Sequence, residues 1–106
     1  MVADQSNSPF ERVLAFEWDE KKRISNLEKH GIDFVDAIAI FDGPCLETLT
    51  DRHVYGEERS ICYGQMEGRV LAVVCTMREV SRRIISARRT TLSESRAYWE
   101  IVYGEQ

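Results

Sequence analysis

The hydrophobic pattern of the N-terminal part of the chain predicts a short strand followed by two helices. Residues 16–18 alternate between apolar and acidic side chains, as a strand does. Asp19 is suited to cap a helix over residues 20–30, and Gly31 is suited to end it. Asp33 is suited to cap a second helix over residues 34–41, where apolar residues recur at helical spacing, so we expect one face of this helix on the core.

The middle of the chain changes to the period-two pattern of strands. Strands are predicted near residues 45–50 and 59–64, with a polar loop from Asp51 to Glu58 between them. Residues 70–77 are nearly all apolar, which predicts a central strand covered on both faces. Residues 82–88 alternate well enough to form the strand beside it.

A capping box over residues 91–94 predicts a final helix that carries Tyr98 and Trp99. Helices segregated around an antiparallel sheet give an α+β fold that leaves one sheet face free for a ligand. The 106 residues suffice for one core. We therefore expect one domain over residues 16–106, preceded by a flexible tail and the start of the first strand over residues 1–15.

Targeting signals and cysteine usage add little to this picture. No apolar stretch is long enough to span a membrane, and the N-terminus lacks a basic flank followed by an apolar run, so we expect a cytoplasmic protein. Cys45, Cys62 and Cys75 are odd in number and lack metal-site spacing. We interpret them as structural thiols, and we expect no metal and no cofactor.

The charge is unevenly distributed along the chain. Residues 69–96 hold seven arginines and two glutamates, a formal charge of +5, which leaves −9 on the rest of a chain whose net charge is −4. A local basic surface can attract a polyanion even on an acidic protein. Strand alternation places Arg83 on one face and Arg82 and Arg88 on the other, so Arg83 and Arg88 can share a phosphate only if a bulge re-aims one of them.

Three ordered blocks of sequence, spread over residues 16–98, resemble the BrnT family of bacterial toxins. The blocks are Phe16-Glu17-Trp18-Asp19 with Lys22, Asn26, Lys29-His30-Gly31-Ile32, Phe34, Ala37 and Phe41-Asp42; then Gly56-Glu57-Glu58-Arg59; then Arg83-Ile84-Ile85-Ser86-Ala87-Arg88-Arg89 with Glu94 and Tyr98. Because the match is distributed, it is far more specific than one short motif.

This resemblance implies a RelE-like fold, an antiparallel sheet with two N-terminal helices and a C-terminal helix. It also implies an endoribonuclease that inhibits translation as the toxin of a type II toxin–antitoxin system. The expected partners are an RNA substrate and a BrnA-type antitoxin with a ribbon-helix-helix DNA-binding domain. The toxin would contact operator DNA only through this antitoxin.

RNA cleavage through the 2′-hydroxyl needs a base, cations that stabilise the pentacoordinate phosphorane, and a proton for the leaving oxygen. The sequence offers no dense acidic cluster for Mg²⁺, so we expect metal-independent chemistry. The candidate catalytic residues are Arg88, Arg83, Glu58, Arg59 and Lys22. Arg88 is the preferred phosphate ligand, Glu58 is a candidate base, and an internal ion pair is the alternative interpretation of Glu58 and Arg59.

Further cationic and polar residues are candidates for holding RNA. They are Arg82, Arg89, Asn26, Lys29 and His30. Helix-end electrostatics is the alternative explanation for Lys22 and His30.

Two other functions stay open: a module that binds RNA or DNA without cleaving it, and a protein whose arginines serve only to bind an antitoxin. Cleavage products separate the first of these from a nuclease.

Overall fold

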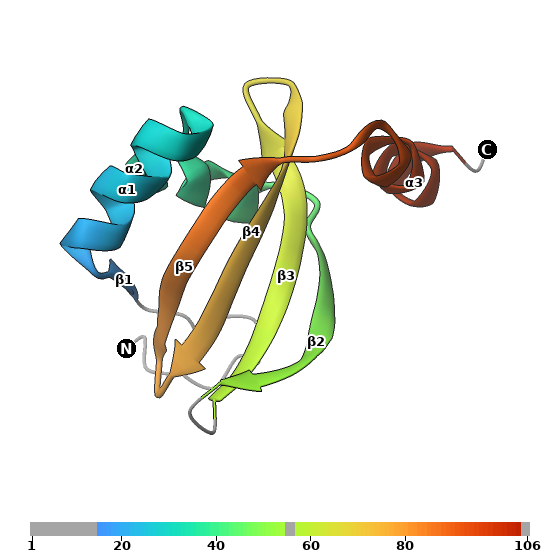
Figure 1. Ribbon diagram of the computed structural model, residues 1–106. Coiled ribbons are helices and arrows are strands. Elements are labelled where there is room, and N and C mark those ends of the chain that lie inside the picture. The colour runs from blue at the N-terminus through green and yellow to red at the C-terminus, as the bar shows by residue number, and fades with distance from the viewer. Residues whose placement is uncertain (1–14, 55–56, 105–106) are drawn as a thin grey trace, which may run out of the picture.

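The computed structural model describes residues 15–54 and 57–104, and it shows an α+β fold built on a five-stranded sheet (Figure 1). The elements are, in chain order, β1 (Ala15–Trp18), α1 (Glu20–His30), α2 (Phe34–Ala37), the 3₁₀ helix η2 (Ile38–Asp42), β2 (Leu46–Val54), β3 (Glu57–Met66), β4 (Arg69–Arg78), β5 (Ser81–Arg89) and α3 (Leu92–Tyr103).

The sheet is mixed, and the expectation of a purely antiparallel sheet is wrong. The strand order is β1-β5-β4-β3-β2, in which β1 pairs parallel to β5 and the other neighbours pair antiparallel. Strands β2 to β5 form a meander joined by short connections, whereas β1 reaches the far edge through α1, α2 and η2. Alternation within β1 predicts a strand but carries no information about its direction.

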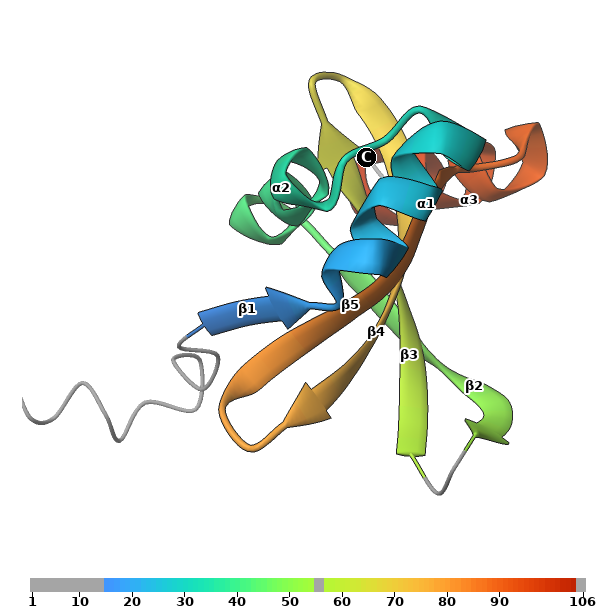
Figure 2. The ribbon, with the colours of Figure 1, turned by 60° about the vertical axis from the view of Figure 1, so that its left-hand side comes forward.

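One face of the sheet, the covered face, packs against α1, α2 and η2. It contributes Cys62, Val73, Cys75, Ile84 and Ala87 to the core, where they meet Phe34 and Ile40. Figure 2 shows α1 and α2 on this side of the sheet and α3 on the other. As predicted, β4 is the central buried strand, with residues 70–73 at most 5% exposed. The open face lies on the opposite side, and among the described residues α3 covers one end of it, where Tyr98 contacts Gln65 and Pro44.

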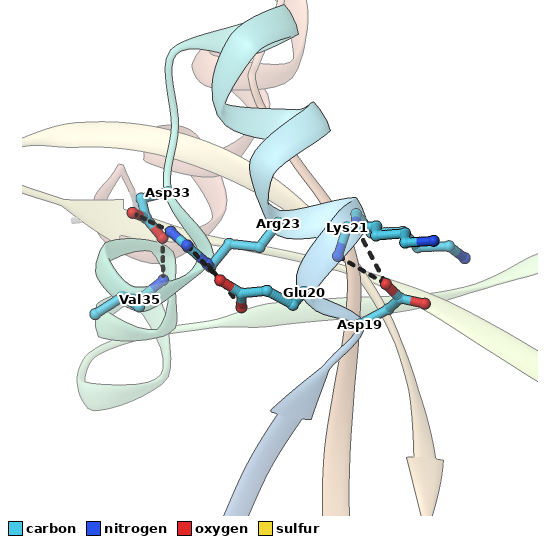
Figure 3. A network of polar contacts seen from close by, with 7 residues as sticks. Asp19, Glu20, Lys21, Arg23, Asp33 and Val35 are labelled. Carbon is cyan, nitrogen blue, oxygen red and sulfur yellow. Dashed lines mark hydrogen bonds and ion pairs between the residues drawn. The ribbon is translucent and has the colours of Figure 1, made fainter.

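Local polar contacts fix both ends of α1 (Figure 3). Asp19 caps the helix by accepting hydrogen bonds from the backbone N–H groups of Lys21 and Lys22, and Gly31 ends it in the left-handed conformation at φ 72°. Arg23 binds Glu20 within the helix and Asp33 at 2.9 Å, and Asp33 in turn caps α2. The caps predicted at Asp19, Gly31 and Asp33 are therefore confirmed.

Two predicted segments differ from the structure. The helix expected over residues 34–41 is a single α-turn that continues as the 3₁₀ helix η2. The polar loop expected from Asp51 to Glu58 belongs largely to β2 and β3, which pair at His53 and Glu58 after an irregularity in register, while residues 55–56 lie outside the described residues. The polar sequence of this segment lacks the hydrophobic alternation from which a strand is predicted, but the backbones of β2 and β3 still pair there.

A β-bulge in β5 decides which arginines share a face. Val74 pairs with Ser86 whereas Cys75 pairs with Ile84, so Ile85 is an extra residue in β5. Parity changes at this point, which is why Ile84 and Ala87 are both buried on the covered face. The extra residue places Arg83 and Arg88 on the same face, and the prediction that simple parity separates them is wrong.

Candidate nucleic-acid interface

The open face carries a row of polar side chains that crosses four strands near the β1 end of β5. Glu17 pairs with Arg83 in the β1–β5 register, and Arg83 pairs with Thr76 of β4. Continuing the β3–β4 register by one residue from Ser60 and Cys75 places Arg59 opposite Thr76. Nη1 of Arg83 lies 2.8 Å from Oε2 of Glu17, so this carboxylate holds the guanidinium over the sheet.

A second row lies near the other end of the open face. Arg88 pairs with Ala72 of β4, which pairs with Tyr63 of β3. Arg88 donates Nη1–H and Nη2–H to the two carboxylate oxygens of Glu94 at 2.9 and 3.0 Å. This paired contact, aided by the backbone N–H of Thr91, lowers the pKa of Glu94 to about 2. Glu94 therefore stays ionised at neutral pH and fixes the direction of Arg88.

Small and apolar side chains separate the two rows. The middle row consists of Thr48, Ile61, Val74 and Ser86. Arg83 and Arg88 oppose residues four apart on β4, so their backbones are about 13 Å from one another. Arg83 and Arg88 therefore rise from two separate places on the same face, with this middle row between them.

Arg59 and Glu58 point to different sides of β3. Arg59 shares its face with Ile61 and Tyr63, whereas Glu58 is exposed on the opposite side and interacts through its backbone, whose carbonyl accepts a hydrogen bond from Thr76 at 2.8 Å. The side chains of Glu58 and Arg59 therefore lie on opposite sides of the strand. Within the described part of the chain, Nε of Arg59 is the buried side-chain polar atom that has no hydrogen-bond partner.

A groove between α1 and the edge of β5 adjoins the open face. β1 pairs with β5 only as far as Ile84, and beyond the bulge the side chain of Asn26 bonds both backbone groups of Ala87 at this edge. The groove encloses about 180 Å³ and is lined by Lys22, Ser25, Asn26, Lys29, His30, Ile85 and Ser86. Lys22, Lys29 and His30 are exposed, and Ser86 lies between Arg83 and Arg88 on the strand. The structure thus gathers these predicted residues beside the arginine face.

Three predicted RNA-binding residues do not present a free side chain on the open face. Asn26 is 6% exposed, and its amide contacts the backbone of Ile32 and Ala87, so it fixes α1 to β5 and is not free for RNA. Arg82 is on the covered face, where Nη1 contacts two cysteine sulfurs. Arg89 is exposed but opposes Leu71, which belongs to the covered face.

Glu17 and Tyr63 belong to this interface but are not among the candidate site residues predicted from the sequence. Glu17 alternates with Phe16 and Trp18, which pack on the core, so the same pattern that predicts β1 already turns its carboxylate away from the core. No comparable signal identifies Tyr63, because its place beside Arg88 depends on the pairing of three strands and on the bulge.

No His, Cys, Asp and Glu group of three or more is arranged to hold a metal ion in the described ranges. The helices described here are all too short or too polar to cross a membrane. The interface therefore presents arginine side chains, of which Arg83 and Arg88 are held in place by Glu17 and Glu94, on a chain whose net charge is negative.

Comparison with known proteins was made at the level of families and of individual proteins. A family model described as the ribonuclease toxin BrnT of a type II toxin–antitoxin system matches residues 18–94. This range contains Arg59, Arg83, Arg88 and Glu94, and it begins at Trp18, one residue after Glu17. No curated protein matches the chain.

Proposed function

The chain belongs to the BrnT family of ribonuclease toxins of type II toxin–antitoxin systems, and from this premise we propose that it cleaves RNA on the open face of its sheet. The observation that carries the proposal is the gathering of Arg59, Arg83 and Arg88 on the face that α1 and α2 leave uncovered. Membership of a type II system also implies a protein antitoxin as partner.

The arginines bind the RNA backbone in this proposal. A phosphate offers two oxygens and negative charge, as a carboxylate does, so it can replace Glu94 on the paired donors of Arg88 and Glu17 on Arg83. The two glutamates hold the guanidinium groups in place until RNA arrives. Arg59, which is partly exposed, brings a third guanidinium group to the row of Arg83.

Cleavage then proceeds by attack of the ribose 2′-hydroxyl on the adjacent phosphorus. Arg83 and Arg59 stabilise the added charge of the phosphorane, and the bond to the 5′-oxygen breaks to leave a 2′,3′-cyclic phosphate. Glu17, beside Arg83, is placed to accept the hydroxyl proton. We propose that this chemistry needs no metal ion.

The groove along α1 extends the RNA path. Lys22, Lys29 and His30 line it, and it meets the open face at Ser86. A strand bound across the arginine rows can continue into this groove, where the exposed cations contact its next phosphates. These residues therefore affect binding more than the rate of bond breaking.

The finer features of the family assignment belong to the same proposal. We propose a RelE-like fold for the domain, a cytoplasmic location, and a BrnA-type antitoxin whose ribbon-helix-helix domain binds operator DNA. An antitoxin that covers the open face would block RNA and would meet the same arginines. The alternative functions, binding without cleavage and antitoxin binding alone, predict no cleavage products.

The test is cleavage of a defined RNA by the purified full chain in EDTA, compared with Arg88→Ala shown to be folded by circular dichroism. We expect products that end in 2′,3′-cyclic phosphate from the wild type, with a rate at least about a hundredfold lower in the variant. Intact RNA from both proteins, with RNA binding retained, would contradict the nuclease and support a binding module.

A further inference from the structure

An apolar pocket lies on the open face, between α3 and the edge strand β2. It encloses about 440 Å³, a size typical of pockets for small organic ligands. On the sheet side it is lined by Leu46 and Thr48 of β2 and by Tyr63 of β3, which the strand register places on the open face. On the helix side it is lined by residues three or four apart, which are Glu94, Ala97, Tyr98 and Ile101. We call it the α3 pocket.

Polar contacts hold α3 over the sheet and keep the α3 pocket open. In the first turn of the helix, Glu94 binds Arg88 of β5 through two hydrogen bonds of 2.9 and 3.0 Å. Further along, the hydroxyl group of Tyr98 donates to the carbonyl oxygen of Pro44 at 2.7 Å and accepts from Gln65 at 3.2 Å. Moving α3 down onto the sheet would break these contacts, so the pocket exists before a ligand arrives.

The walls of the α3 pocket suit a planar ring. Ile101 is 65% exposed and Ala97 is also exposed, so apolar surface on the helix side is left in water. Tyr63 supplies an aromatic ring on the sheet side. Nucleobases stack on tyrosine rings, and burial of the apolar side chains adds to the stability of such a complex. A base is therefore a suitable occupant.

The ion pair of Arg88 and Glu94 joins the α3 pocket to the proposed path of the RNA. Arg88 opposes Ala72, which opposes Tyr63, so the arginine rises beside the sheet wall of the pocket. In the proposed function a phosphate takes the paired donors of Arg88, and a strand held there brings a neighbouring base to the pocket. The carboxylate of Glu94 then loses Arg88 and keeps only the N–H of Thr91, at 2.9 Å, among the partners described.

We propose that the α3 pocket binds one guanine base of the RNA and that Glu94 accepts its hydrogen bonds, an inference that rests on the proposed function. Guanine presents N1–H and N2–H side by side, as Arg88 presents two N–H groups to Glu94 in the free protein. Phosphate replaces the carboxylate on Arg88, and guanine replaces the guanidinium on Glu94. Each charged group thus keeps two hydrogen bonds.

The other bases match a carboxylate less well. Adenine and cytosine present an amino group beside a ring nitrogen that is an acceptor, and uracil presents one N–H between two carbonyl oxygens. An ionised carboxylate only accepts hydrogen bonds, so each of these bases sets an acceptor against it. A pocket that merely stacks bases would show no such preference. Preference for guanine is therefore the specific result to look for.

The experiment measures binding of the full chain to short RNAs by fluorescence anisotropy. Every ribose carries a 2′-O-methyl group, which prevents cleavage through the 2′-hydroxyl, and a single guanosine is moved along an oligouridylate. At one position we expect binding about tenfold tighter than that of the uridine strand. Inosine, which lacks the N2 amino group, should lose much of this gain.

The controls separate failure of the pocket from failure of the proposed function. Equal affinity for all these strands, together with weaker binding in Arg88→Ala, would overturn the guanine pocket and leave RNA binding by the open face in place. A chain that binds none of the strands would contradict both.

Variants of the pocket test where the base lies. Ala97→Leu fills the α3 pocket and should abolish the preference for guanosine, whereas Ala97→Ser leaves it open and should retain the preference. Glu94→Gln turns one acceptor into a donor and should also abolish the preference, with affinity for the uridine strand changed by less than about threefold because Arg88 keeps its charge. Circular dichroism checks that each variant is folded. A preference that survives Ala97→Leu would overturn the proposal and leave the pocket to another occupant, such as an apolar segment of the antitoxin.

Discussion

At the scale of single residues, Asn26 links α1 to the sheet. Its side chain donates to the carbonyl groups of Ile32 and Ala87 and accepts from the N–H of Ala87 just after the bulge, with distances of 2.9 to 3.1 Å. Replacing a buried amide of this kind leaves backbone groups without partners. Asn26→Ala should lower the free energy of unfolding by about 2 to 4 kcal/mol.

Urea denaturation measures this loss, and Lys22→Ala on the exposed side of the same helix is the matched control. The control should change stability by less than about 0.5 kcal/mol. If Asn26→Ala were as stable as the control, the hydrogen bonds of Asn26 would not be what fixes α1.

Glu94 gives the chain a pH dependence at acid pH. Its pKa is lowered from the ordinary value of 4.5 to about 2 by Arg88, so the ionised form stabilises the folded state above pH 4.5 and this contribution is lost as the pH falls towards 2. Glu94→Gln should cost about 1 to 2 kcal/mol at pH 7, and the difference from wild type should shrink between pH 5 and pH 3. Thermal melts of both proteins across this pH range measure the difference in stability. A difference that stays constant from pH 5 to pH 3 would contradict the ion pair.

At the scale of elements, β3 approaches η2 closely at Gly64. A Cβ built there would lie 2.7 Å from Cβ of Ile40 and 2.9 Å from its carbonyl oxygen, and Ile40 is fully buried. The helix cannot move without opening the core, so Gly64→Ala should destabilise the protein by about 1 to 3 kcal/mol. Gly43→Ala, which meets nothing within 4 Å, is the control. Similar melting temperatures for the two variants would contradict this packing.

The elements differ in how far the sequence could predict them. Caps at Asp19, Gly31 and Asp33 and the capping box of α3 are local signals, and the structure confirms them. The parallel pairing of β1 and the bulge at Ile85 are properties of strand neighbours, which hydrophobic periodicity does not encode. The sequence therefore predicted Arg83 and Arg88 as candidate site residues, but strand alternation placed them on opposite faces, and the bulge brings them to the same one.

At the scale of the whole molecule, the two faces of the sheet have different surroundings. The covered face packs against α1, α2 and η2 and holds Arg82 against the sulfur atoms of Cys62 and Cys75. The open face carries Arg59, Arg83 and Arg88 and leaves them partly exposed. A net charge of −4 alone would argue against RNA, yet the fold brings these three arginines to one surface.

The division of faces is tested most directly by RNA cleavage rates of arginine variants taken from both sides. Arg83→Gln and Arg88→Gln remove charges from the open face, whereas Arg69→Gln and Arg89→Gln remove equal charges from strand positions on the opposite side, where their partners Met66 and Leu71 belong to the core. We predict rates lowered at least about a hundredfold in the first pair and less than about threefold in the second. Equal losses in all four variants would mean that overall charge, and not the open face, governs the reaction.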